Sequence, residues 1–100
     1  MREIDSVQLS AAIDSGAKVV DVREPREYAA GHVPGAVNIP MGHLPGRLDE
    51  IDRSAPVYVI CATGNRSSVM TRVLNGAGFE AFNVAGGTSA WIQSGRPIQK

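Results

Sequence analysis

The stretch that decides the fold is Val57-Tyr58-Val59-Ile60-Cys61-Ala62-Thr63-Gly64-Asn65-Arg66. Its first four residues are apolar and rich in β-branched and aromatic side chains, which predicts a short buried strand. The residues that follow Arg66, at positions 67–74, have a helical pattern of apolar side chains. Cys61, the single cysteine of the chain, therefore lies where a buried strand ends and a helix begins.

Residues 61–66, here called the cysteine loop, combine features that suit a reactive thiol. Backbone N–H groups at a helix start are unpaired, and Gly64 permits the backbone to curl them into an anion-binding nest. Thr63 and Asn65 add side-chain donors, and Arg66 adds a fixed positive charge. Such surroundings lower the pKa of a cysteine below its free value of ~8.5. A lone cysteine after an apolar strand is equally typical of an ordinary core residue, and these residues alone do not separate the two interpretations.

Composition narrows the class of protein. One hundred residues are typical of one domain, and 43% of them are hydrophobic. Ten Lys and Arg balance ten Asp and Glu without a basic run, which argues against nucleic acid or an anionic membrane as the main partner. A single cysteine cannot form an internal disulfide, and no metal site is expected. With no apolar run of ~18 to 20 residues and no signal-like N-terminus, the expected location is the cytoplasm.

The remaining segments alternate between strand and helix patterns. Strands are predicted at residues 3–5, 17–22, 36–39, 57–60 and 80–84. Helices are predicted after a Ser6 cap and up to Gly16, at 26–30 behind Pro25, from Pro45 with Leu48 and Ile51 on one side, at 66–75, and from a Thr88 or Ser89 cap to about residue 94. This alternation predicts an α/β fold with a mainly parallel sheet and helices on both faces. Ligands of such sheets bind beyond the carboxyl ends of the strands, where Cys61 lies.

Three motifs resemble one known family. DVREPREYAAGHVPGAVNIP at 21–40 is similar to the first signature of the rhodanese-like (sulfurtransferase) domain: D-V-R, then E-Y, then G-H-I-x-G-A-x-N-I-P. CATGNR at 61–66 is similar to its C-x-x-G-x-R loop. VAGGTSAW at 84–91 with GRP at 95–97 resembles its closing G-G-x-x-x-W-x-x-x-G-x-P. The motifs occur in the family's order and cover nearly the whole chain, so the sequence resembles a single rhodanese-like domain over residues 1–100.

The resemblance implies a five-stranded parallel sheet and an enzyme, a sulfurtransferase of the thiosulfate:cyanide type. Cys61 is then the nucleophile that takes a sulfur atom from a small anionic donor and holds it as a persulfide, before cyanide, a cellular thiol or a protein acceptor removes it. The implied substrate-binding residues are those that follow it: Ala62, Thr63, Gly64, Asn65 and Arg66. The resemblance implies no metal and no organic cofactor.

Two positions bear on the substrate. Many thiosulfate-using members have a basic residue directly after the cysteine, and here that residue is Ala62. The change removes one positive charge and leaves room for a small or neutral persulfide donor. The related phosphatases use a longer C-x5-R loop, whereas here Arg66 comes five positions after Cys61 and position 67 is Ser67. The shorter loop suits one sulfur atom better than the oxygens of a phosphate.

Other candidate residues are interpreted mainly as structural. Asp21 and Arg23 follow another predicted strand and border the pocket in one interpretation. In the favoured one, Arg23 pairs with Glu27 and Asp21 accepts from backbone. His32 is assigned to the turn that contains it. A second hypothesis for the whole chain stays open: a slow or non-enzymatic module of the same fold that delivers sulfur to a protein partner.

Overall fold

The computed structural model describes residues 2–100, which form one five-stranded sheet in the order β1-β5-β4-β2-β3. All four strand pairs are parallel. The strands are β1 (Glu3–Ile4), β2 (Lys18–Asp21), β3 (Val37–Asn38), β4 (Val57–Ile60) and β5 (Ala81–Val84). The helices are α1 (Ser6–Asp14), α2 (Pro25–Ala30), α3 (Asn65–Gly76) and α4 (Gly87–Gln93), with 3-10 turns η1 (Leu44–Gly46) and η2 (Leu48–Glu50). The predicted α/β fold with a parallel sheet is confirmed.

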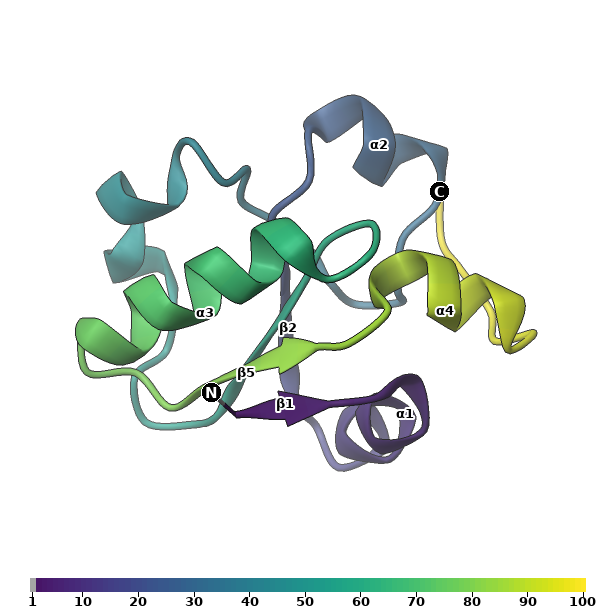
Figure 1. Cartoon of the computed structure of the whole chain (residues 1–100), viewed down its shortest axis with the longest axis horizontal. Coiled ribbons are helices and arrows are strands. Elements are labelled where there is room, and N and C mark those ends of the chain that lie inside the picture. Colours follow the sequence, from purple (N-terminus) through teal and green to yellow (C-terminus); the bar gives the residue numbers. More distant parts are fainter. Residues whose placement is uncertain (1) are drawn as a thin grey trace.

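Alternate side chains of β4 point into two separate cores. Val57 and Val59 face the side of the sheet that α3 covers, where they pack with Leu74 and Phe79. Ile60 faces the opposite side, where it packs with residues of α1 and α4 such as Leu9 and Trp91. Figure 1 shows α3 on one side of the sheet and α1 and α4 on the other. Because both faces of the central strands are covered, their sequences are apolar without strict alternation.

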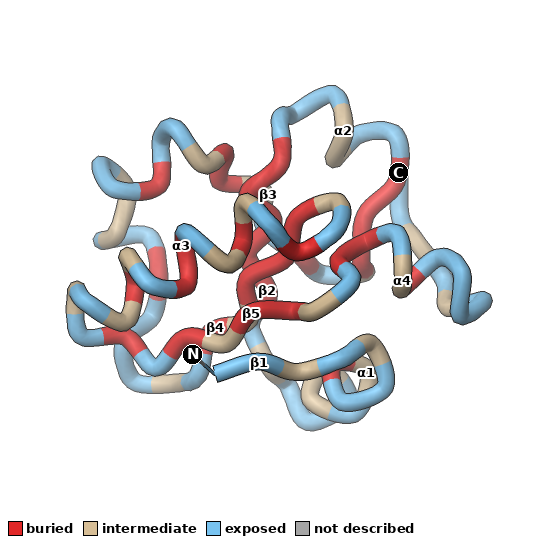
Figure 2. Tube along the Cα trace, in the orientation of Figure 1, coloured by how far each residue is buried: buried red, intermediate tan, exposed pale blue. Residues whose placement is uncertain are grey.

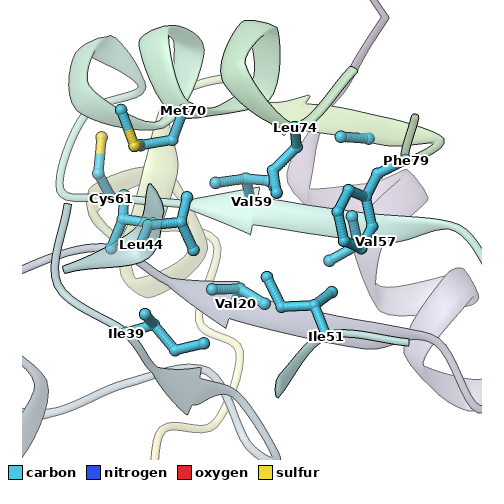
Figure 3. Packing of buried hydrophobic residues seen from close by; sticks show 12 residues of the cluster. Val20, Ile39, Leu44, Ile51, Val57, Val59, Cys61, Met70, Leu74 and Phe79 are labelled. Carbon is cyan, nitrogen blue, oxygen red and sulfur yellow. The ribbon is translucent and has the colours of Figure 1, made fainter. Parts of the chain in front are cut away.

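The buried residues are concentrated in the central strands, while the outward surfaces of the helices are exposed (Figure 2). Figure 3 shows that Cys61 lies at the end of the core on the α3 side, next to Leu44 and Met70. The thiol therefore belongs to the packed core and, at the same time, stands at the carboxyl end of β4. The sheet places it at the edge where the loops after β2, β4 and β5 meet.

Two predicted helix caps are wrong. The first helix is capped by Asp5 instead of Ser6: the Asp5 carboxylate accepts from Gln8 N–H at 2.8 Å, and the Gln8 side chain accepts from Asp5 N–H at 3.0 Å. This reciprocal capping box satisfies more backbone donors than the serine hydroxyl would. The last helix is capped by Gly86, with φ of 77°, instead of Thr88 or Ser89. The Thr88 hydroxyl is engaged elsewhere, on the carbonyl of Cys61.

The predicted helix from Pro45 is also wrong. The chain forms the two separate turns η1 and η2 there, broken at Arg47. Leu44 and Ile51 are buried on the α3 side of the sheet and Leu48 packs against the same core. Leu44, Leu48 and Ile51 have the i, i+4, i+7 spacing of a helix face, but the two short turns pack the same side chains against the core without one continuous helix. Residues 44–51 therefore cover part of the same core that contains Cys61.

Candidate active site

The sulfur of Cys61 is held inside the curl of the cysteine loop. The residue is 1% exposed, and the backbone N–H of Gly64 donates to its Sγ at 3.1 Å. The hydroxyl of Ser67, in the first turn of α3, lies 3.3 Å from the same sulfur. Gly64 adopts φ of 107°, a conformation that residues with a Cβ rarely adopt, and this turns the loop N–H groups inward. The backbone N–H of Gly64 thus points at the sulfur from within the loop.

The net effect of these surroundings is a lowered thiol pKa. Burial of Cys61 disfavours the thiolate and raises the pKa. Hydrogen bonds oppose this and prevail: they come from the Ser67 hydroxyl and from the backbone N–H groups of Ser67, Gly64 and Thr63. A lowered pKa increases the thiolate fraction near neutral pH, and the thiolate is the nucleophilic form of cysteine. These hydrogen bonds therefore favour the thiolate of Cys61 more than burial disfavours it.

The turn after β5, here called the glycine turn (Gly86 and Gly87), holds the cysteine loop from behind. Backbone N–H groups of Thr88 and Ser89 donate to the carbonyls of Cys61 and Ala62 at 2.9 and 3.0 Å. A Cβ on Gly87 would lie 2.5 Å from the Cys61 carbonyl oxygen. Only glycine permits this approach, and with the carbonyls fixed toward α4 the loop N–H groups remain free to face the sulfur.

Arg66, expected to add a fixed positive charge to the loop, is paired. Its guanidinium donates to both carboxylate oxygens of Glu27 on α2, at 2.8 and 3.0 Å. The hydrogen bond from Arg66 lowers the pKa of Glu27 from 4.5 to about 2, and Glu27 in turn raises the pKa of Arg66. A bidentate pair of this kind cancels most of the charge that an incoming anion would meet.

Asp21 and Arg23 pair with each other, so the predicted Arg23–Glu27 pair is wrong. Asp21 is fully buried and accepts from both the backbone and the guanidinium of Arg23, at 3.0 and 2.8 Å. Arg23 also donates to the carbonyl of Gly31 at 2.9 Å. The carboxylate of Glu27 instead accepts from Arg66 through both of its oxygens. The Asp21–Arg23 pair fastens the exit of β2 to the end of α2, and α2 is the helix that presents Glu27.

The other predicted loop residues lie around the sulfur at different depths. Ala62 is half-buried, whereas Thr63 and Asn65 are exposed on the outer surface of the loop. His32 has the predicted scaffold position: its Nδ1 lies 2.8 Å from the carbonyl of Tyr28, and its ring stacks on the Tyr28 ring. Over residues 2–100 no cluster of three or more His, Cys, Asp or Glu is arranged to hold a metal ion. In the same range, none of the helices has the length and apolar character needed to cross a bilayer.

Three residues near the site were missed by sequence reasoning: Glu27, Ser67 and Asn83. Asn83 on β5 accepts from the Ser67 hydroxyl at 2.6 Å and so contacts the group that faces the sulfur. A polar residue inside an otherwise apolar strand was the available signal for Asn83. Glu27 lies within the first motif, but its partner could not be read from the sequence. Ser67 follows Arg66 directly, but the sequence alone gives no signal that its hydroxyl faces the sulfur.

Comparison with known proteins identifies the family. The family model of the rhodanese-like domain matches residues 5–94. A sulfurtransferase of Allochromatium vinosum is 37% identical over 98% of this chain and 94% of its own length. The thiosulfate sulfurtransferase GlpE of Pseudomonas entomophila is 35% identical over 90% of this chain and 84% of its own length. The crystal structure of a rhodanese-related protein from Thermoplasma volcanium has a TM-score of 0.94 at 34% identity and covers 99% of this chain and 98% of its own. The chain belongs to the rhodanese-like domain family, and its sulfurtransferase relatives support a role in sulfur transfer.

Proposed function

We propose that this protein is a sulfurtransferase that carries a sulfane sulfur on Cys61. The observation that carries the proposal is the position of the Cys61 sulfur, 3.1 Å from the inward N–H of Gly64 at the start of α3, with a lowered pKa. The donor is thiosulfate or a persulfide, and the acceptor is cyanide in an assay or a thiol of a small molecule or a protein. Covalent catalysis of this kind divides the transfer into two easier steps.

In the first step the Cys61 thiolate attacks the outer sulfur of the donor. A bond forms between Sγ and that sulfur, the donor's own sulfur–sulfur bond breaks, and the leaving group departs with the electron pair. The leaving group is sulfite from thiosulfate, or a thiolate from a persulfide. In the second step cyanide or a thiolate attacks the outer sulfur, the bond to Sγ breaks, and Cys61 leaves as a thiolate ready for the next donor.

The backbone of the cysteine loop stabilises the charge that these steps move. After the first step the negative charge rests on the outer sulfur, beyond Sγ, where N–H groups at the start of α3 provide fixed partial positive charge. These N–H groups need no reorganisation during the reaction, because the segment after β5 already holds the carbonyls of the loop through hydrogen bonds. Thr63 and Asn65, exposed on the same loop, are in place to meet the donor or acceptor.

The charge of the cysteine loop and the low exposure of Cys61 both favour a persulfide over thiosulfate as the donor. Ala62 supplies no cation, and Glu27 neutralises Arg66 through a bidentate pair. The loop thus lacks a free positive side chain for a dianion. Cys61 is 1% exposed, so the donor must present its outer sulfur on a narrow group. The terminal sulfur of a persulfide fits this requirement better than the sulfur of thiosulfate, which sits on a bulky sulfonate.

Intact-mass spectrometry tests the proposal directly. The protein is incubated with thiosulfate or with glutathione persulfide, separated from the donor, and weighed. Because Cys61 is the only cysteine, a gain of one sulfur atom that disappears in Cys61→Ser assigns the carrier. Wild type is expected to gain one sulfur and to lose it on addition of cyanide or a thiol. If neither donor, nor a protein persulfide, loads Cys61, the proposed function is wrong.

The donor preference has its own test in Glu27→Gln. The glutamine keeps the capping hydrogen bond to Glu24 N–H but removes the charge that neutralises Arg66. The kcat/KM with thiosulfate is expected to rise several-fold, while that with glutathione persulfide changes little. Glu80→Gln, an exposed carboxylate before β5, is the matched control for net charge. Equal changes for both donors would show that the ion pair has no part in the choice of donor.

A further inference from the structure

A chain of polar side chains runs from the Cys61 sulfur to the edge of the sheet. The Ser67 Oγ lies 3.3 Å from Sγ and 2.6 Å from Asn83 Oδ1. The Asn83 Nδ2 donates to the carboxylate of Glu3 at 2.9 Å. Ser67 and Asn83 are buried, whereas Glu3 is exposed on the edge strand β1. The chain thus links the thiol to solvent on the side away from the cysteine loop.

Sheet register explains how these residues meet. Glu3 and Asn83 are partners in the parallel pairing of β1 with β5, so their side chains lie on the same face of the sheet. That face is the one that α3 covers, and Ser67 comes from the first turn of α3. Three segments that are distant in sequence therefore place one polar group each along a single line.

Hydrogen-bond chemistry fixes the direction of the chain. A carboxylate only accepts, so the amide nitrogen of Asn83 must face Glu3 and its oxygen must face Ser67. The oxygen of an amide also only accepts, so the Ser67 hydroxyl is the donor across the 2.6 Å contact. A hydroxyl has one proton. Cys61 Sγ and Asn83 Oδ1 consequently compete for the same proton of Ser67.

The three states of Cys61 differ in how they fit this chain. The neutral thiol donates to Ser67, which donates to Asn83, which donates to Glu3, so every group has a partner. The thiolate is stabilised by the Ser67 proton in addition to the loop N–H groups, but taking that proton leaves the oxygen of Asn83, a residue 2% exposed, without a donor. In a persulfide the charge lies on the outer sulfur, and Sγ is a weak acceptor that does not require the proton. The chain therefore suits the thiol and the persulfide, and limits how far the Ser67 hydroxyl can stabilise the empty thiolate.

We propose that Asn83, oriented by Glu3, is a positioning residue that withholds the Ser67 proton from the empty thiolate and so favours the sulfur-loaded form of Cys61. The part that concerns the loaded form rests on the proposed function, whereas the effect on the free thiol does not. The charged groups at this end of the sheet are already paired: Arg66 of α3 with Glu27 of α2, and Arg23 with Asp21 at the exit of β2. Variants of the polar chain leave both pairs intact.

The first experiment measures the pKa of the Cys61 thiol from the pH dependence of its alkylation by iodoacetamide. Asn83→Leu removes the competing acceptor and is expected to lower the pKa by about one unit, since a hydrogen bond to a charged group then forms without loss elsewhere. Glu3→Ala frees the Asn83 amide to turn its nitrogen toward Ser67 and is expected to lower the pKa by less. Glu3→Gln keeps an acceptor for Asn83 and is expected to restore the wild-type value.

Ser67→Ala supplies the decisive control. The double variant Ser67→Ala with Asn83→Leu is expected to have the same thiol pKa as Ser67→Ala alone, because no hydroxyl remains to donate to the thiolate. Glu3 is exposed on the edge strand, so Glu3→Ala keeps the proposal testable even if Asn83→Leu does not fold. A pKa that is unchanged or raised in Glu3→Ala, with Glu3→Gln at the wild-type value, overturns the proposal.

The second experiment follows the loaded form. Protein loaded by glutathione persulfide is mixed with a fixed ratio of glutathione and its persulfide, and the loaded fraction at equilibrium is read by intact mass. The ratio of loaded to empty protein is expected to fall several-fold in Glu3→Ala relative to wild type and Glu3→Gln. An unchanged ratio contradicts the proposal for the loaded form. If no variant takes up sulfur, the proposed function fails, while the thiol pKa still decides the role of Asn83.

Discussion

The cysteine loop and the glycine turn follow neighbouring parallel strands, β4 and β5, and each leads into a helix capped by a left-handed glycine. The caps are Gly64, with φ of 107°, and Gly86, with φ of 77°. In the cysteine loop the N–H groups face the sulfur of the chain's only thiol. Directly after the glycine turn, in the first turn of α4, the N–H groups of Thr88 and Ser89 are bonded to the carbonyls of that same loop.

The comparison shows that a strand–turn–helix connection does not make a ligand site by itself. The unpaired N–H groups at a helix start can donate either to a ligand or to carbonyls of the protein's own backbone. Here the N–H groups of Thr88 and Ser89 donate to the carbonyls of the cysteine loop. The N–H groups of the cysteine loop therefore remain available to face the sulfur. The cysteine loop is held in place by these hydrogen bonds from the segment behind it.

The largest expected effect comes from Gly87→Ala, which breaks the contact between the two turns. The added Cβ would lie 2.5 Å from the Cys61 carbonyl oxygen and 2.6 Å from the backbone of Ala62. The clash and the positive φ together are expected to cost about 3 kcal/mol of unfolding free energy, measured by urea denaturation. The control is Gly95→Ala, which shares a positive φ of 80° but has no atom within 4 Å of the added Cβ. Equal losses in the two variants would remove the glycine turn from its supporting role.

Gly64→Ala changes the cysteine loop itself and is expected to have a smaller effect on stability. A residue with a Cβ is strained at φ of 107°, at a cost of about 1 to 2 kcal/mol. Relief of the strain turns the Gly64 N–H away from Sγ, so the thiol pKa should rise and alkylation near neutral pH should slow. An unaltered pH profile of alkylation in a folded variant would mean that the Gly64 N–H does not stabilise the thiolate.

Glu27→Gln tests the ion pair over the cysteine loop through its pH dependence. Because the folded-state pKa of Glu27 is depressed from 4.5 to about 2, the pair stabilises the protein above pH 4.5 and loses its effect as pH falls toward 2. For this partly exposed pair the difference from wild type is expected to be about 1 kcal/mol at pH 6. Urea denaturation of both proteins from pH 6 to pH 2 should show the difference shrinking to zero, and a constant difference would refute the linkage.

Thr88→Val is expected to have the smallest effect. It removes the hydroxyl that donates to the Cys61 carbonyl at 3.1 Å but leaves the backbone N–H of residue 88 on the same oxygen. With the acceptor still satisfied, the loss should be about 0.5 kcal/mol and the thiol pKa should not move. A shift of the pKa would show that the hydroxyl, rather than the backbone, holds the loop in place.

Much of the fold could be predicted because its signals are local. Val57 to Ile60 are apolar and prone to strand formation, and glycine or proline interrupts the chain between most elements. Two of the wrong predictions concern helix caps, where several hydrogen-bond partners compete for the same groups. Asp5 displaced Ser6 as a cap because it forms a reciprocal pair with Gln8, and Thr88 could not cap α4 because its hydroxyl bonds to a carbonyl from another loop.

By itself, the sequence determined that one thiol stands at the carboxyl end of a buried strand, before a loop with a glycine and a helix start. Those properties depend on neighbours within a few residues. Only the tertiary structure decided that Arg66 is neutralised by Glu27, 39 residues away, and that Ser67 is shared between Cys61 and Asn83. Hydrogen-bond partners are chosen by distance and direction in space, and the parallel order of the sheet brings β1, β4 and β5 side by side against α3. Local residues of the loop surround the thiol, whereas the partners of Arg66 and Ser67 come from distant segments that no local pattern specifies.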